Sequence, residues 1–126
     1  MPEPSPLTLE GQSVAKLAAH PDLAAVFRSV VRGRQTYIYR HLHAADPGSL
    51  RTKDQRYVFG WTCDGGDCAQ EGLFLGYDTQ LERIYLLLLD EGYASLTVPT
   101  RRSPWPAQLA EAVLAVKPDL PSFRTE

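Results

Sequence analysis

The chain has 126 residues, of which 44% are hydrophobic and 22% charged, a composition typical of one soluble globular domain with its own core. Its 13 Lys and Arg against 15 Asp and Glu give a formal net charge of −2, which argues against broad nucleic-acid binding because phosphates require a cationic face. No apolar run approaches the roughly 20 residues that cross a bilayer. We therefore expect a single domain over residues 1–126, with a loose Pro-rich segment over residues 1–12, no bound cofactor and no membrane span.

The opening residues, MPEPSPLTLEG, lack the basic and apolar regions of a secretory signal. Two alternatives follow for the compartment. The protein is cytoplasmic, or it is exported and the signal segment has been removed from the sequence as given.

Two helices are expected near the start of the chain. Residues 13–20 predict a short helix with Ser13 as its N-cap, and residues 22–33 predict a stronger helix with Asp22 as its cap and Gly33 at its end. The second helix has apolar residues at i, i+3, i+4, i+7 and i+8, namely Leu23, Val26, Phe27, Val30 and Val31. Such an apolar stripe must pack on another element of the fold.

The central part of the chain predicts strands, with a polar loop over residues 41–54. The five expected strands are residues 35–40, 55–63, 69–78, 81–90 and 93–100. In the second strand, alternation places Tyr57, Phe59 and Trp61 on one face. Short turns between the later strands indicate an antiparallel meander.

A closing helix is expected over residues 106–116, with Leu109, Val113 and Val116 on its apolar face. The predicted fold class is therefore α+β, a five-stranded antiparallel meander sheet covered by N-terminal and C-terminal helices.

The segment WTCDGGDC, residues 61–68, contains the only two cysteines. Zinc normally needs three or four ligands, and no second cysteine pair is present. Calcium could use Asp64 and Asp67, but the EF-hand pattern is missing. A redox centre would favour the shorter C-x-x-C spacing. A structural disulfide between Cys63 and Cys68 fits the spacing best, and it would hold an exposed loop in the shape that binds a partner.

Other groups offer weaker signals for chemistry. His41 and His43 would share one face of a strand, yet two histidines alone do not form a metal site. The carboxylates at turns are expected to be solvated, namely Asp78, Glu82, Asp90 and Glu91. The pair Arg101 and Arg102, near Trp105, could contact a nucleic-acid strand, or could approach the last helix while the Trp anchors it in the core. Neither a nucleophile elbow nor a phosphate-binding loop is found, so the sequence predicts a binding protein and no enzyme.

The order of four segments resembles the Ivy family, the inhibitors of vertebrate (C-type) lysozyme. The segments are DLAAVFRSVVRG, RYVFGWTCDGGDC, EGLFLGYDTQLERIYLLLLDEG and LTVPTRRSPWPAQLAEAVLAV, within residues 13–116. The resemblance implies a five-stranded meander covered by helices, export to the bacterial periplasm, and a lysozyme or related peptidoglycan-cleaving enzyme as partner. It also implies that a short disulfide-closed loop enters the active-site cleft of the lysozyme.

The loop of this chain matches the family pattern Cys-Lys/Glu-Pro-His-Asp-Cys in part. The two cysteines and Asp67 match, whereas Asp64 stands where Lys or Glu is usual, Gly65 where Pro is usual and Gly66 where the inhibitory His is usual. A histidine can bridge two catalytic carboxylates, but glycine offers only its backbone N–H. The resemblance therefore implies a partner-binding loop, residues 64–67, with altered inhibition of C-type lysozyme, and it leaves open an unrelated protein partner.

Overall fold

The computed structural model describes residues 5–42, 48–63, 67–99 and 103–118. Within these ranges the chain forms one 3₁₀-helix, four α-helices and one five-stranded sheet. In chain order the elements are η1 (Pro6–Leu9), α1 (Val14–Ala19), α2 (Pro21–Val30), α3 (Gln35–Leu42), β1 (Arg51–Lys53), β2 (Tyr57–Cys63), β3 (Gly72–Asp78), β4 (Arg83–Asp90), β5 (Tyr93–Val98) and α4 (Ala107–Val116).

The sheet is a simple antiparallel meander with strand order β1-β2-β3-β4-β5. Tight turns join β1 to β2 and β4 to β5. Asp54 and Gln55 have φ angles of 57° and 50°, and Glu91 and Gly92 have 52° and 84°, as hairpin turns of this hand require. The predicted α+β class and meander are confirmed.

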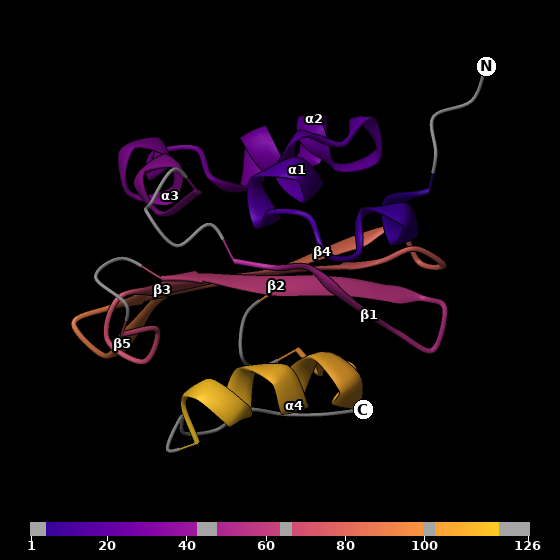
Figure 1. Ribbon diagram of the computed structural model, residues 1–126. Helices are drawn as coiled ribbons and strands as arrows, with labels where there is room; N and C mark the ends of the chain where they lie inside the picture. The colour runs from indigo at the N-terminus through magenta and orange to yellow at the C-terminus, as the bar shows by residue number, and fades with distance from the viewer. Residues whose placement is uncertain (1–4, 43–47, 64–66, 100–102, 119–126) are drawn as a thin grey trace.

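Helices cover both faces of the sheet, so the molecule has three layers (Figure 1). The helices α1, α2 and α3 lie on one face, over a core that includes Val58, Leu75 and Leu86. The helix α4 lies on the other face, over a core that includes Phe74 and Tyr85. Because side chains alternate along a strand, β2 and β3 contribute to both cores, and the four leucines 86–89 of β4 are all buried, as expected for a central strand.

The first expected strand, residues 35–40, is wrong: this segment belongs to the helix α3. Its buried residues are Ile38, His41 and Leu42, spaced i, i+3 and i+4 as on one face of a helix. The five-strand count still holds because β1 forms inside the expected polar loop, where Thr52 pairs with Val58.

The ends of the helices α1 and α2 differ in detail from the expectation. The helix α2 begins at Pro21, and its capping side chain is His20, whose Nδ1 accepts a hydrogen bond from the N–H of Asp22 at 3.0 Å. Asp22 is therefore not the cap. Ser13 precedes α1 as predicted but makes no side-chain capping bond. Val26 is 52% exposed, so the apolar stripe of α2 is narrower than its spacing predicted.

Candidate protein-binding site

The two cysteines close a loop at the end of β2. Cys63 is the last residue of β2, Cys68 lies in the turn before β3, and the structure joins them by a disulfide with their Cα atoms 4.7 Å apart. The predicted structural disulfide is confirmed. Of the predicted partner-binding residues, Asp67 is described and exposed, whereas Asp64, Gly65 and Gly66 lie outside the described residues.

The segment after the loop folds into a compact turn around Asp67. Its carboxylate Oδ1 accepts a hydrogen bond from the N–H of Ala69 at 3.1 Å. Its backbone carbonyl accepts from the N–H groups of Gln70 and Glu71 at 3.2 and 2.9 Å. Asp67 thus stabilises the turn in which it lies, as Asp side chains commonly do at such positions. This turn fixes the C-terminal end of the cysteine loop, as β2 fixes its N-terminal end.

The same turn rests on the β4–β5 turn. The N–H of Gly92 donates to the carbonyl of Gln70 at 3.0 Å, and the N–H of Glu91 donates to Oε1 of Glu71 at 3.3 Å. Gly72 is needed where β3 begins, because a Cβ there would collide with the carbonyl oxygen of Cys68. The turn that follows Cys68 is therefore well supported by its contacts at this end of the sheet.

A groove begins beside the disulfide and runs between the sheet and α4. Two adjoining hollows of about 560 and 310 Å³ form it, and we call them together the α4 groove. Its lining residues are Gly48, Ser49, Arg51, Thr52, Lys53, Phe59, Gly60, Trp61, Cys63, Cys68, Gln108, Glu111, Ala112, Ala115 and Val116. The two hollows share Arg51, Phe59 and Ala112, so they adjoin one another between the sheet and α4.

Trp61 fixes α4 against the sheet at the centre of this groove. Its Nε1–H donates to the backbone carbonyl of Ala112 at 3.1 Å, and its ring lies 5.4 Å from that of Phe74. Trp61 and Phe59 are both half-buried, so part of each ring faces the groove. The sequence placed these rings on one face correctly, but the groove itself was missed, because the small residues Ala112 and Ala115 give no pattern.

The opposite end of the sheet carries a partly buried ion pair that was also missed. The Arg56 guanidinium donates to both carboxylate oxygens of Asp78, at 2.8 and 2.7 Å. Oδ1 also accepts from the N–H groups of Gln80 and Leu81 at 2.9 and 3.2 Å. The prediction of a solvated Asp78 is wrong, since its side chain is fully buried.

These bonds decide the charge state of Asp78. Burial alone raises the pKa of its carboxyl group, but the hydrogen bonds from Arg56 and two backbone N–H groups, with the guanidinium charge, outweigh it. The pKa of Asp78 therefore lies below its ordinary value of 3.8, and the ion pair stays charged at neutral pH.

The remaining sequence candidates do not come together. His41 is buried in α3, not on a strand, and His43 lies outside the described residues. Over the described part of the chain, no group of three or more His, Cys, Asp or Glu could hold a metal ion. Trp105 is fully buried in the α4 core, as its role as an anchor predicted, whereas Arg101 and Arg102 lie outside the described residues.

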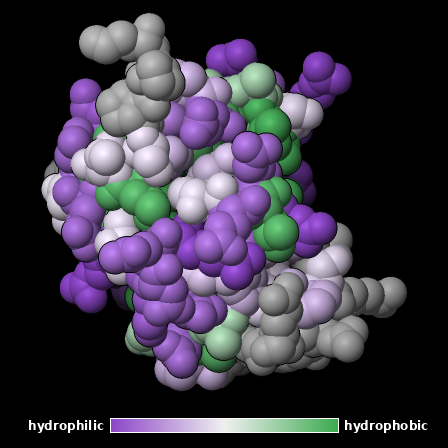
Figure 2. Space-filling view, turned by 90° about the vertical axis from the view of Figure 1, so that its right-hand side faces the viewer, coloured by the Kyte–Doolittle hydropathy of each residue, from purple (hydrophilic) through white to green (hydrophobic). Residues whose placement is uncertain are grey.

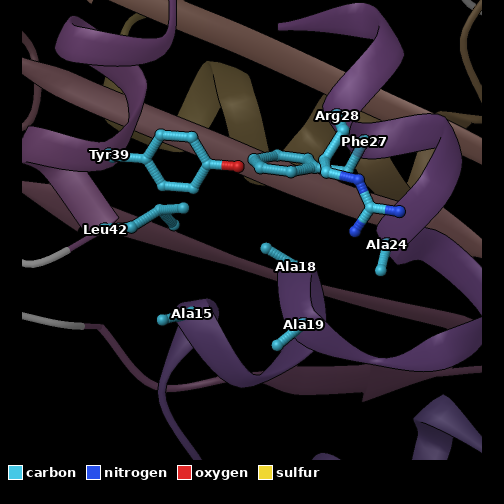
Figure 3. A pocket seen from close by; sticks show the side chains of 8 residues that line it. All are labelled: Ala15, Ala18, Ala19, Ala24, Phe27, Arg28, Tyr39 and Leu42. Atoms are coloured by element: carbon cyan, nitrogen blue, oxygen red, sulfur yellow. The ribbon is translucent and has the colours of Figure 1, made fainter.

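A further hollow of about 360 Å³ lies on the other side of the sheet, among α1, α2 and α3. Figure 3 shows Ala18 of α1 pointing toward the rings of Phe27 and Tyr39, with the Tyr39 side chain extending toward Phe27. The two rings meet edge to face, with centroids 6.1 Å apart. This pocket shares no lining residue with the α4 groove.

Among the described helices, none combines the length and the apolar character that crossing a membrane requires.

Searches of the curated proteins and of the solved structures found no match. The family model described as inhibitor of vertebrate lysozyme (Ivy) matches residues 22–118. This range includes every strand, the disulfide and α4. Proteins of this family act outside the cytoplasm, and a disulfide fits an oxidising compartment. The match covers most of the sequence, and the chain therefore belongs to the Ivy family of lysozyme inhibitors.

Proposed function

We propose that this protein binds a lysozyme or a related peptidoglycan-cleaving enzyme through the loop closed by Cys63 and Cys68, as an inhibitor and not as an enzyme. The family match carries the proposal. The contact residues are Asp64, Gly65, Gly66 and Asp67, and the working compartment is the bacterial periplasm. The disulfide and the turn at Asp67 support this role, because a loop with fixed stems loses little conformational freedom on binding.

Gly66 is expected to weaken the inhibition of C-type lysozyme. The family places a histidine there, which can hydrogen-bond two catalytic carboxylates at once. Gly66 cannot do so, and Asp64 and Asp67 would meet those carboxylates with charge of the same sign. We expect inhibition of C-type lysozyme that is weaker than a histidine-bearing loop would give.

Titration of lytic activity tests the proposal. The purified protein, with its disulfide formed, is titrated against a C-type lysozyme, a G-type lysozyme and lytic enzymes of the producing bacterium. A saturable loss of activity with at least one enzyme is expected at micromolar protein. Full activity of all of them at that excess would contradict the proposal.

The role of the loop is tested by Gly66→His. This change should tighten binding to C-type lysozyme about tenfold, which equals about 1.4 kcal/mol. Ala107→His is the matched control, because Ala107 is exposed at the start of α4 and lines neither hollow of the α4 groove. Equal affinities for the two variants would show that the loop is not the contact.

A second function keeps the fold and changes the partner. The absence of histidine at position 66 favours a diverged interaction protein that binds a protein unrelated to lysozyme. Affinity capture from periplasmic and cytoplasmic extracts separates the two functions. Recovery of a lytic enzyme supports the first, and reproducible recovery of an unrelated protein, lost in Cys63→Ala with Cys68→Ala, supports the second.

A further inference from the structure

We propose that the α4 groove binds a second segment of the lysozyme partner, an extended apolar stretch that carries a carboxylate. This inference rests on the proposed function and deepens it. The loop would supply one contact and the groove another. The partner segment would come from the rim of the cleft that receives the loop.

Continuity with the loop is the first argument. Cys63 and Cys68 themselves line one end of the larger hollow, so a partner seated on the loop lies directly against the mouth of the groove. From there the groove passes Trp61 and Phe59 and reaches Lys53 and Glu111 at its far end. A partner that contacts only the loop would leave this adjoining surface unused.

The shape of the groove is the second argument. Its floor is formed by the half-buried rings of Phe59 and Trp61, and its wall by small side chains of α4, including Ala112 and Ala115. The hydrogen bond from Trp61 to the Ala112 carbonyl holds the floor in place before any partner arrives. Partly exposed aromatic side chains that are already ordered are typical of residues that dominate binding energy.

The charges along the groove select the partner segment and its direction. Arg51 is exposed on β1, and within the described residues it has no ion pair, whereas Lys53 and Glu111 neutralise each other at 3.2 Å. The carboxylate of Asp54 adds a negative charge at the far end, where it accepts a hydrogen bond from Gln108 at 2.7 Å. Arg51 is thus, in the part of the chain that the structure describes, the positive charge of the groove lining that lacks an ion pair, and it lies between the negative charges of Asp54 at the far end and Asp67 at the loop end. A partner that presents a basic surface to the loop and a carboxylate to Arg51 is favoured over the reverse orientation.

Two substitutions with matched controls test the inference. Ala115→Trp fills the groove from an exposed position of α4, and Ala107→Trp places the same ring on the same helix outside the groove. Arg51→Glu reverses the groove charge, and Arg32→Glu makes the same charge change at an exposed position after α2. Binding to the lysozyme that the wild type inhibits is measured by calorimetry, after thermal unfolding shows that each variant is folded.

We expect Ala115→Trp and Arg51→Glu each to raise the dissociation constant at least tenfold, with both controls within twofold of the wild type. The Arg51 effect should shrink as salt is raised from 50 to about 300 mM, because exposed charges are screened over roughly a Debye length. Wild-type affinity in both groove variants, while Gly66→His still changes binding, overturns the groove contact and leaves the proposed function standing. If the wild type binds no lytic enzyme, the proposed function fails and the groove inference fails with it.

Discussion

At one end of the sheet, Arg56 and Asp78 join the β1–β2 and β3–β4 turns through an ion pair whose carboxylate is fully buried. At the other end, a covalent bond between Cys63 and Cys68 closes the loop after β2. Figure 2 views the first end, where hydrophilic side chains cover most of the surface and the hydrophobic patches are small. The second end carries the loop and the mouth of the α4 groove.

The comparison shows why the two ends use different chemistry. Asp78 satisfies both of its oxygens inside the protein, so that end is fixed by hydrogen bonds that need burial to be strong. A loop that must reach a partner cannot bury its residues, and a disulfide fixes its stems without requiring burial of the loop residues. The first end therefore serves stability, and under the proposed function the second serves binding.

The largest expected effect on stability comes from Asp78→Ala. It leaves Arg56 without its counter-charge and two backbone N–H groups without their acceptor. Unfolding in urea should show a loss of about 3 kcal/mol, the lower part of the range for a broken buried pair, because Arg56 is partly exposed. The exposed Asp90→Ala at the other end of β4 should stay within about 0.5 kcal/mol of the wild type. Similar losses in both variants would contradict a special role for the ion pair.

Removal of the disulfide by Cys63→Ala with Cys68→Ala should cost less stability. Closing so short a ring stabilises by roughly 2 kcal/mol on the chain-entropy model. Lysozyme binding should suffer more than stability, since the loop loses its fixed stems. The wild type treated with a reductant is the control and should match the double variant in urea unfolding. If the double cysteine variant loses more stability than Asp78→Ala, the disulfide end contributes more to stability than the Arg56–Asp78 end, contrary to this comparison.

The pH dependence sharpens the same comparison. Because the folded-state pKa of Asp78 lies below the ordinary 3.8, its ion pair contributes fully above that value, and the contribution is lost as pH falls through the folded pKa. The stability gap between the wild type and Asp78→Ala should therefore be constant from pH 7 to about pH 5 and should narrow below about pH 4. Urea unfolding at several pH values measures the gap. A constant gap down to pH 2.5 would contradict the depressed pKa.

The smallest effect is expected from Glu71→Ala at the cysteine end. This change removes the hydrogen bond of 3.3 Å from the N–H of Glu91, an exposed contact. A loss of about 0.5 kcal/mol is expected in urea unfolding, as for weak exposed hydrogen bonds. A loss comparable to that of Asp78→Ala would show that polar contacts stabilise both ends equally.

Most of the fold could be predicted because its elements carry clear patterns. The buried leucines of β4 and the alternating rings of β2 predicted strands that the structure contains. The segment 35–40 failed because its Tyr and Ile favour strands, and the helical spacing of Ile38, His41 and Leu42 appears only when the window extends to residue 42. The strand β1 has no apolar residue, so nothing in Arg51–Lys53 indicated a strand.

The candidate site could be predicted only where it is local in sequence. The cysteine spacing indicated the disulfide that the structure contains. The α4 groove joins residues from β1, β2 and α4, and the Arg56–Asp78 pair joins two turns 22 residues apart. Such contacts depend on strand register, which composition and spacing do not reveal.

The two fixed stems of the loop have a consequence for engineering. Cys63 is held by β2 and Cys68 by the turn at Asp67, so the three positions between Cys63 and Asp67 are a cassette whose ends belong to the scaffold. Random sequences at positions 64–66 could be displayed there without altering either core. A library selected against different lytic enzymes would yield inhibitors that differ from one another at only three positions.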